Sequence, residues 1–471
     1  MRIHVVQNGD TLWRLARMYD TTINQIAFAN SITTPDMLTV GQSLVIPTPN
    51  IDYVVEPGDN LASIAARFGV TVQEIVVTNN IADPNLINVG RMLHMPYYYY
   101  QIRQGDTIYA VAERSGVSVA QLNALNQLTT NSVIYPGQII KVPVYNKDQT
   151  EVNAYTTTFD EQGRNEILAL GSFLTYLTPF SYEVREDGSI QTLYDQFVLE
   201  AAIMTNTTPL LVITNFQNGS FNSDLAAAIL RNVDVQMTLI DHILMEMAAK
   251  GYQGLNIDFE YVYPEDRENY NTFLRRVVDR LHPNYSVSTA LAPKESREQQ
   301  GTLYEAHDYR AHGQIADFVV IMTYEWGWAG GSPLAIAPIN KVQQVLNYAV
   351  TEIPSEKIMM GVPLYGRDWR IPWQQGTFAR TVTPLEAVQL AIRYQAEIMY
   401  NETFQSPYFN YVDETGQAHE VWFEDARSVQ VKYDTVKSYG LRGVSYWVLG
   451  NPFPQNWAVL SSSFNIEKKQ L

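Results

Sequence analysis

Short apolar segments recur in register three times along the first 145 residues. Each unit begins with a brief strand-like run, continues with two segments of helical apolar spacing, and closes with an apolar run that ends at a proline. A Gly-Asp pair precedes the first helical segment, and an Asn follows twenty residues after the Asp. Self-similarity of this kind predicts a repeat architecture, here three β-α-α-β modules over 1–48, 52–97 and 99–145.

From about residue 150 the repeat gives way to apolar segments that alternate with amphipathic helical stretches. This alternation predicts parallel β/α units, because parallel strands need a crossover connection between them. Eight such units within 150–471 predict a (β/α)8 TIM barrel, so the fold class is α/β with three small modules ahead of the barrel. The strand segments are 151–156, 174–180, 209–216, 254–260, 286–292, 318–324, 357–366 and 443–450.

The stretch 367–436 is too long for one connection between a strand and the next helix. It contains a helix candidate at 384–396 and strand-like pieces at 399–404 and 408–414. We therefore expect a small α+β insertion between the seventh and eighth strands.

One strand segment carries polar residues on the side that faces the barrel interior. Alternation along 254–260 places Asn256, Asp258 and Glu260 on one face, with Glu260 at the carboxyl end, where TIM barrels keep their active residues. Two carboxylates on one face push their pKa values apart, so that one can hold a proton near neutral pH. The pattern favours acid–base catalysis; an ion-pair network within the barrel is the alternative.

The composition narrows the choice of partners. Lys and Arg number 32 and Asp and Glu 49, a formal net charge of −17, which disfavours nucleic acid and anionic lipid. With no cysteine and no metal-ligand spacing among its seven histidines, the chain is expected to need no metal and no cofactor. No apolar run reaches the length of a membrane span and no signal peptide is recognisable. We expect a monomer.

The three modules resemble LysM modules in the Gly-Asp-Thr-Leu start, the Asn after the second helix and the Gly-Gln…Ile-Pro close. The resemblance implies binding to N-acetylglucosamine polymers, peptidoglycan or chitin, between the Gly-Asp-Thr loop and the loop after the second helix. For each Asp, we favour a role as helix N-cap over sugar contact. The glycan-binding residues that the resemblance implies are Gly9, Asp10, Thr11, Asn30, Gly58, Asp59, Asn60, Asn79, Gly105, Asp106, Thr107 and Asn126.

The barrel resembles glycoside hydrolase family 18, the chitinase-like barrels. The family's strand-4 motif, Asp-x-x-Asp-x-Asp-x-Glu, matches 253–260 in its last Asp and its Glu, while Gln and Asn replace the first two Asp. Its strand-6, strand-7 and strand-8 ends match 322–325, 361–367 and 445–447. The resemblance implies Glu260, Asp258 and Tyr324 as catalytic residues and Asn256, Trp447, Glu325, Tyr365 and Arg367 as substrate-binding residues. Trp326, in a Gly-rich loop, is a further candidate for a sugar platform.

The resemblance also implies a retaining, substrate-assisted mechanism. Glu260 protonates the glycosidic oxygen, and the substrate's own 2-acetamido carbonyl attacks the anomeric carbon to form an oxazolinium ion. Asp258 orients the acetamido N–H, Tyr324 hydrogen-bonds the acetamido oxygen, and Trp447 forms the floor under the sugar. Asn256 cannot share a proton with Asp258 as the family's Asp does, so the pH profile is expected to differ.

Modules that resemble LysM, together with a family-18-like barrel that has Asn at position 256, look like the spore cortex-lytic and germination N-acetylglucosaminidases of endospore-forming bacteria. The expected function is hydrolysis of N-acetylglucosaminyl bonds in peptidoglycan, in the bacterial spore cortex or coat or in the cell wall. A chitinase is one alternative, and a non-catalytic cell-wall lectin is another. Such lectins usually lose the glutamate, which is present here as Glu260.

Overall fold

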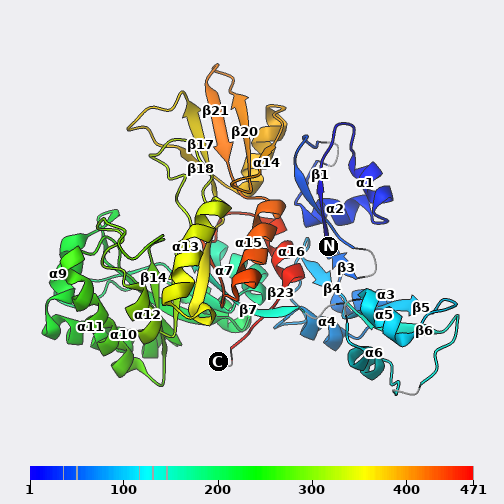
Figure 1. The fold of residues 1–471 in the computed structure, drawn as a ribbon, viewed down its shortest axis with the longest axis horizontal. Helices are drawn as coiled ribbons and strands as arrows, with labels where there is room; N and C mark the ends of the chain where they lie inside the picture. Colours follow the sequence, from blue (N-terminus) through cyan, green and yellow to red (C-terminus); the bar gives the residue numbers. More distant parts are fainter. Residues whose placement is uncertain (35–36, 49–50, 116, 130–131, 145–146, 470–471) are drawn as a thin grey trace. The chain divides into compact units, whose positions relative to one another are not determined.

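The computed structural model describes residues 1–34, 37–48, 51–115, 117–129, 132–144 and 147–469. The chain forms two compact units (Figure 1). The first comprises Met1–Leu38, Ser43–Gln149 and Pro454–Asn465, and the second comprises Thr39–Gln42, Thr150–Phe453 and Ile466–Leu471.

The three modules of the first unit fold as β-α-α-β, as predicted. In each, the two strands pair antiparallel and the two helices cover a small apolar core. The first module contains β1 (Arg2–Val5), α1 (Leu12–Met18), α2 (Ile23–Ala29) and β2 (Ser43–Ile46); the second β3 (Asp52–Val54), α3 (Leu61–Phe68), α4 (Val72–Thr78) and β4 (Met92–His94); the third β5 (Tyr97–Gln101), α5 (Ile108–Ser115), α6 (Val119–Leu125) and β6 (Ile139–Pro143). Helix α16 (Pro454–Ser463) also belongs to this unit.

The Asp of each Gly-Asp pair does not cap the first helix, so that prediction was wrong. The residue after it does: Thr11 caps α1 and Asn60 caps α3, each accepting a backbone N–H three residues on. The Asp carboxylate points the other way and closes the turn that enters the helix. It accepts the backbone N–H three residues earlier at 2.8 Å in every module, from Gln7 to Asp10, from Glu56 to Asp59 and from Arg103 to Asp106.

Eight parallel strands of the second unit form a closed barrel, which confirms the predicted fold class. The order runs β13-β14-β15-β16-β22-β7-β8-β10, and β10 pairs with β13 to close the ring. Every predicted strand segment overlaps one of these strands: β7 (Asp148–Thr156), β8 (Tyr176–Pro179), β10 (Thr208–Thr214), β13 (Gly254–Asp258), β14 (Ser286–Leu291), β15 (Phe318–Ile321), β16 (Ile358–Pro363) and β22 (Gly443–Trp447).

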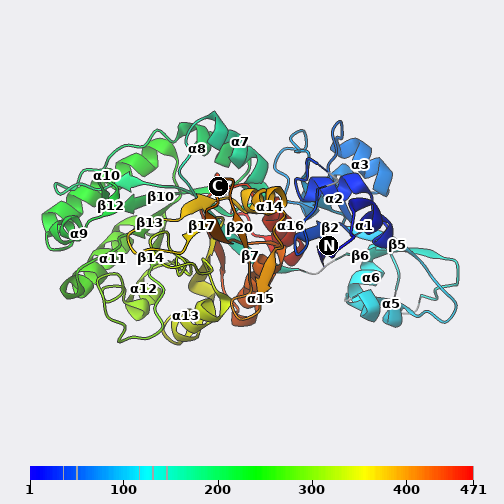
Figure 2. The same ribbon diagram turned by 90° about the horizontal axis from the view of Figure 1, so that it is seen from above.

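Helices surround the barrel, as Figure 2 shows from above. Strand alternation turns Phe259 outward, where its ring stacks on Phe273 with centroids 6.1 Å apart. The helices are α7 (Glu161–Leu170), α8 (Gln196–Met204), α9 (Ser223–Leu230), α10 (Val233–Lys250), α11 (Arg267–Leu281), α12 (Tyr309–Ile315), α13 (Ile339–Glu352) and α15 (Ala426–Tyr439). The short strands β9 (Tyr182–Glu183), β11 (Phe216–Gln217) and β12 (Ser220–Phe221) also belong to this unit, and β23 (Phe464–Ile466) spans the boundary between the two units along the chain.

The insertion between β16 and β22 is a five-stranded antiparallel sheet with one helix, α14 (Pro384–Arg393). Its order is β18 (Arg380–Val382), β17 (Gly366–Ile371), β21 (Ala418–Trp422), β20 (Ser406–Val412) and β19 (Met399–Asn401). The sheet ends at Trp422, whereas the predicted insertion extends to 436; residues 426–436 instead form most of α15.

The described ranges lack two features that would indicate a membrane or a metal ion as a partner. No single helix in those ranges is long and apolar enough to cross a membrane, and α3 and α4 satisfy the length and composition only as a pair bent by 100°. Nor do the same ranges contain a group of three or more His, Cys, Asp or Glu side chains that could hold a metal ion.

Candidate active site

Strand β13 delivers two carboxylates to the mouth of the barrel. Asp258 is its last residue and pairs in register with Thr214 of β10, while Glu260 follows two residues later. Both side chains line a cavity of about 650 Å³. The predicted direction of these two side chains is therefore correct.

Burial changes the titration of both carboxyl groups. It raises the pKa of Asp258 to about 7, because the charged form is poorly solvated. Burial also raises the pKa of Glu260 well above its usual value, and the nearby negative charges of Asp258 and Glu325 raise it further. A raised pKa favours the protonated form, which is the form that a general acid needs. Oδ1 of Asp258 is buried and has no hydrogen-bond partner within the described part of the chain.

Asn256 lies behind the carboxylates rather than on the cavity surface. Its Oδ1 accepts the hydroxyl of Tyr155 at 2.9 Å and its Nδ2 donates to Ser288 at 2.9 Å, so both ends of the carboxamide are engaged. Its side chain is 1% exposed and is not among the residues that line the cavity. We therefore reassign Asn256 from substrate contact to the support of the site.

Three predicted residues form one polar group at the cavity wall. Glu325 has a φ of +68°, in the left-handed region that side chains seldom adopt. Its carboxylate accepts the hydroxyl of Tyr365, and Arg367 Nη2 donates to the same Oε1 at 3.0 Å. Glu325 and Arg367 line the cavity, whereas Tyr365 is 3% exposed and is not among the lining residues. It contacts both of them, through its hydroxyl to Glu325 and through its ring, whose centroid lies 4.8 Å from Arg367 Cζ.

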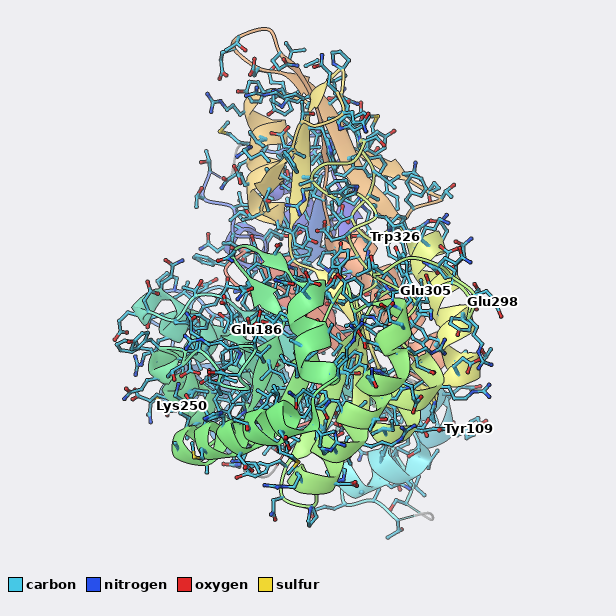
Figure 3. The ribbon with its side chains drawn as sticks, turned by 90° about the vertical axis from the view of Figure 1, so that its left-hand side faces the viewer. Tyr109, Glu186, Lys250, Glu298, Glu305 and Trp326 are labelled. Carbon is cyan, nitrogen blue, oxygen red and sulfur yellow. The ribbon has the colours of Figure 1, made fainter. Side chains whose placement is uncertain are left out.

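Tyr324 and Trp447 also line the cavity, as predicted from the strand ends. Burial raises the pKa of Tyr324 well above its usual value, so its hydroxyl keeps its proton and can donate a hydrogen bond. Trp326 lines the same cavity, and Figure 3 shows it where the barrel meets the insertion.

A row of aromatic rings that the sequence reasoning missed continues the cavity wall. Phe180 packs edge-on against Trp447 with centroids 4.8 Å apart, and Phe216 packs against Phe221 at 5.2 Å. Rings of this kind suit the apolar faces of sugars. Their positions in the sequence could have identified two of these rings, because Phe180 and Phe216 are the last residues of two predicted strand segments. The other lining residues missed are Tyr155, Tyr261, Pro293, Leu303, Tyr304 and Met322, whereas Trp328 lies in the same Gly-rich loop as Trp326 and was a candidate with it.

The module asparagines are engaged inside their own modules. Asn79 Nδ2 donates to Ile75 O and His94 O, both at 2.9 Å, and its Oδ1 accepts the backbone N–H of His94 at 2.8 Å. Asn30 and Asn126 make the same three bonds in their modules. These side chains join the second helix to the closing strand, so we assign them to module structure rather than to sugar contact.

The remaining candidate residues of the loops predicted to bind glycan also have structural roles. Gly9, Gly58 and Gly105 have φ values of +84°, +90° and +88°, which a turn of this shape requires. Thr11, Asn60 and Thr107 use their side chains to cap the helices. A role in sugar contact for these loops remains a prediction.

A family model described as Glycosyl hydrolases family 18 matches residues 152–451. The chain belongs to this family. It is therefore a glycosidase, and the LysM domain model matches residues 4–47, 53–96 and 100–143. The resemblances drawn from the sequence motifs are confirmed.

Relatives cover the whole chain. A cortical fragment-lytic enzyme of Bacillus subtilis (strain 168) is 44% identical over 475 residues, 100% of this chain and 99% of that one. One of Bacillus anthracis is 49% identical over 307 residues, 65% of this chain and 71% of that one. Among solved structures, the Bacillus cereus spore cortex-lytic enzyme SleL matches with a TM-score of 0.78 and 40% identity, over 99% of this chain and 98% of that one.

Proposed function

We propose that this family 18 glycosidase hydrolyses N-acetylglucosaminyl bonds of spore cortex peptidoglycan with retention of configuration, using the substrate's 2-acetamido group as nucleophile. The observation that carries the proposal is the pair of buried carboxyl groups that line the cavity at the barrel mouth. Burial raises the pKa of Asp258 to about 7, and burial with the nearby negative charges raises that of Glu260 well above its usual value. In the proposal Glu260 serves as the acid and Asp258 as the carboxylate beside it.

The two carboxyl groups take different roles in the proposed reaction. Glu260 donates its proton to the glycosidic oxygen as the bond to the anomeric carbon breaks. The acetamido carbonyl oxygen of the same sugar then bonds to that carbon and forms an oxazolinium ion. Glu260, now ionised, removes a proton from the water that opens this ring, which restores the acetamido group and the protonated Glu260.

Asp258 and the cavity walls stabilise the developing charge. The unpartnered Oδ1 of Asp258 accepts the acetamido N–H, and its negative charge offsets the positive oxazolinium ion. The hydroxyl of Tyr324 donates to the acetamido oxygen. Trp447, packed edge-on against Phe180, supplies the apolar floor under the reacting sugar.

The choice of substrate follows from the relatives. Proteins named as cortical fragment-lytic and spore cortex-lytic enzymes align with essentially the whole chain at 40–44% identity, modules included. A Chromobacterium violaceum chitinase matches 67% of this chain and 98% of that one at 24% identity with a TM-score of 0.61, which shows the shared fold alone. We therefore place the substrate, and the site of action, in the spore cortex.

The test is digestion of purified spore cortex and colloidal chitin in parallel, with Glu260→Gln as the matched control. The expected result is release of fragments from cortex by the native protein, with N-acetylglucosamine at the new reducing end by mass spectrometry. Glu260→Gln should bind cortex and release nothing. Fragments from chitin alone would refute the peptidoglycan substrate, and binding without release by the native protein would leave a lectin.

A further inference from the structure

The side chain of Asn215 binds the main chain of Glu260 at both polar groups. Asn215 Oδ1 accepts the Glu260 N–H at 3.0 Å, and Nδ2 donates to the Glu260 carbonyl oxygen at 2.8 Å. Nδ2 also donates to the carbonyl oxygen of Asn222 at 2.9 Å. The side chain is fully buried, and its acceptor and both of its donor hydrogens are used on main-chain groups.

Glu260 needs such a partner because it lies beyond the end of the barrel ladder. The register between β10 and β13 ends at Thr214 and Asp258. Asn215 is the next residue after β10, and its carboxamide presents one acceptor and one donor to Glu260, as a strand's peptide group would. The Asn215 side chain thus extends the hydrogen bonding between the two strands as far as Glu260.

The peptide group between Phe259 and Glu260 is bound at its carbonyl as well as at its N–H. His307 Nε2 lies 2.9 Å from the carbonyl oxygen of Phe259, and its Nδ1 accepts the backbone N–H of Ala292 at 2.8 Å. Since Nδ1 is an acceptor, Nε2 carries the proton and donates a hydrogen bond to the Phe259 carbonyl oxygen. Both polar groups of the Phe259–Glu260 peptide are therefore bound by buried side chains, the carbonyl by His307 and the N–H by Asn215.

The same carboxamide ties the acid to the aromatic wall. Asn222 follows the hairpin β11–β12, whose Phe216 and Phe221 line the cavity, and its N–H donates to Asn215 O at 2.9 Å. Ser223 Oγ donates to the carbonyl oxygen of Tyr261, the residue after the acid, at 2.5 Å. The hairpin that lines the cavity and the loop that carries Glu260 thus share one hydrogen-bond junction.

We propose that Asn215 is the positioning residue for Glu260: its carboxamide fixes the main chain of the acid against the β11–β12 hairpin and so sets where the proton is delivered. The inference rests on the proposed role of Glu260. The negative charges of Asp258 and Glu325 raise the pKa of Glu260, but the Asn215 side chain bonds to Glu260 and Asn222 and to neither carboxyl group, so its effect is separable from theirs.

The experiment compares Asn215→Ala and Asn215→Asp with the native full-length chain on soluble cortex glycan fragments. In Asn215→Asp an oxygen replaces the Nδ2 amide group and faces the carbonyl oxygens of Glu260 and Asn222. The variant therefore loses both of these hydrogen bonds, although the side chain keeps nearly the same size and shape. We expect both variants to lose about 100-fold or more in kcat with KM changed less than about threefold, because a misplaced acid weakens proton delivery and not ground-state binding.

A second readout separates positioning from loss of fold. Loss of the Asn215 hydrogen bonds should let water reach Glu260, and better solvation of its charged form lowers its pKa. The basic limb of the Asn215→Ala pH profile should therefore move to lower pH by about 0.5 unit or more. Asn232→Ala is the structural control, because Asn232 only caps α10, through the N–H groups of Asp234 and Val235. It should lower Tm and leave kcat and the pH profile unchanged.

The outcomes are distinct. Native kcat in both Asn215 variants, or an equal loss in Asn232→Ala, overturns the positioning role. If Asn215→Ala does not fold, Asn215→Asp carries the same test. An inactive native protein refutes the proposed function instead, since no positioning role can then be measured.

Discussion

The hydroxyl of Tyr155 donates to Asn256 Oδ1 at 2.9 Å, and this bond sets the orientation of a carboxamide buried inside the barrel. The amide group of Asn256 is thereby turned to Ser288. A carboxamide does not titrate, so Asn256 places no acid beneath Asp258, and both of its ends bond to neutral hydroxyl groups.

Tyr155→Phe should lower the free energy of unfolding by about 1–3 kcal/mol, because it leaves the buried Asn256 oxygen without its donor. Urea denaturation followed by tryptophan fluorescence measures the change. Tyr194→Phe is the matched control, since Tyr194 is 90% exposed and should tolerate the same deletion. Equal stability of the two variants would show that the Tyr155 bond contributes nothing.

The pH dependence of kcat/KM should be bell-shaped, with its acidic limb near pH 7. The active form has Asp258 ionised and Glu260 protonated; below the Asp258 pKa of about 7 both carry protons, and kcat/KM falls up to about tenfold per pH unit. At higher pH Glu260 loses its proton and activity falls again. Initial rates on soluble cortex fragments measure both limbs. Asp258→Asn should be much slower and lack the acidic limb; an acidic limb near the usual carboxyl pKa in the native protein would contradict the assignment.

Glu325→Gln should shift the basic limb to lower pH. The negative charge of Glu325 helps to raise the pKa of Glu260, so its removal makes the acid easier to ionise. Arg367→Gln should shift the same limb to higher pH, because the 3.0 Å ion pair that offsets Glu325 is then lost. The pH profiles of kcat/KM of the two variants therefore serve as controls for each other. If both variants shift the basic limb in the same direction, this electrostatic account is contradicted.

Asn79→Ala should destabilise its module by at least about 2 kcal/mol, because it strands buried backbone groups of Ile75 and His94. Thermal unfolding by calorimetry detects the loss. Asn85→Ala, at an exposed loop position of the same module, should leave the transition unchanged. If Asn79→Ala is as stable as the native protein but binds glycan less well, then Asn79 contacts sugar and our reassignment is wrong.

Much of the fold could be predicted because it depends on periodicity. Alternation along 254–260 identified which side chains face inward, and Asp258 and Glu260 are found at the barrel mouth as expected. The helix caps show where such reasoning stops. Asp and Thr both accept helical N–H groups, and the pattern Gly-Asp-Thr does not say which of the two does so; the turn geometry decides for Thr11.

The contacts between strands could not be predicted from any one segment. Asn215 and Glu260 are 45 residues apart, and the pair exists only because β10 lies beside β13 in this register. Phe180 and Trp447 likewise meet only after ring closure. A periodic pattern assigns a residue to a face, but the identity of its neighbour across the barrel depends on register, which the sequence pattern leaves open.

The unpartnered Oδ1 of Asp258 has a consequence for selectivity. A buried acceptor without a donor is an energetic cost that the free enzyme carries, and a sugar with an N–H at carbon 2 removes that cost on binding. If the hydroxyl at carbon 2 of a sugar points away from Asp258, or if the sugar has no donor there, the cost of the unsatisfied acceptor remains in the complex. Discrimination of this kind can reach about 10⁴-fold or more, far beyond what a missing methyl group in an apolar pocket provides. Cellulose and starch fragments would then be rejected by an unmet hydrogen bond rather than by a steric barrier.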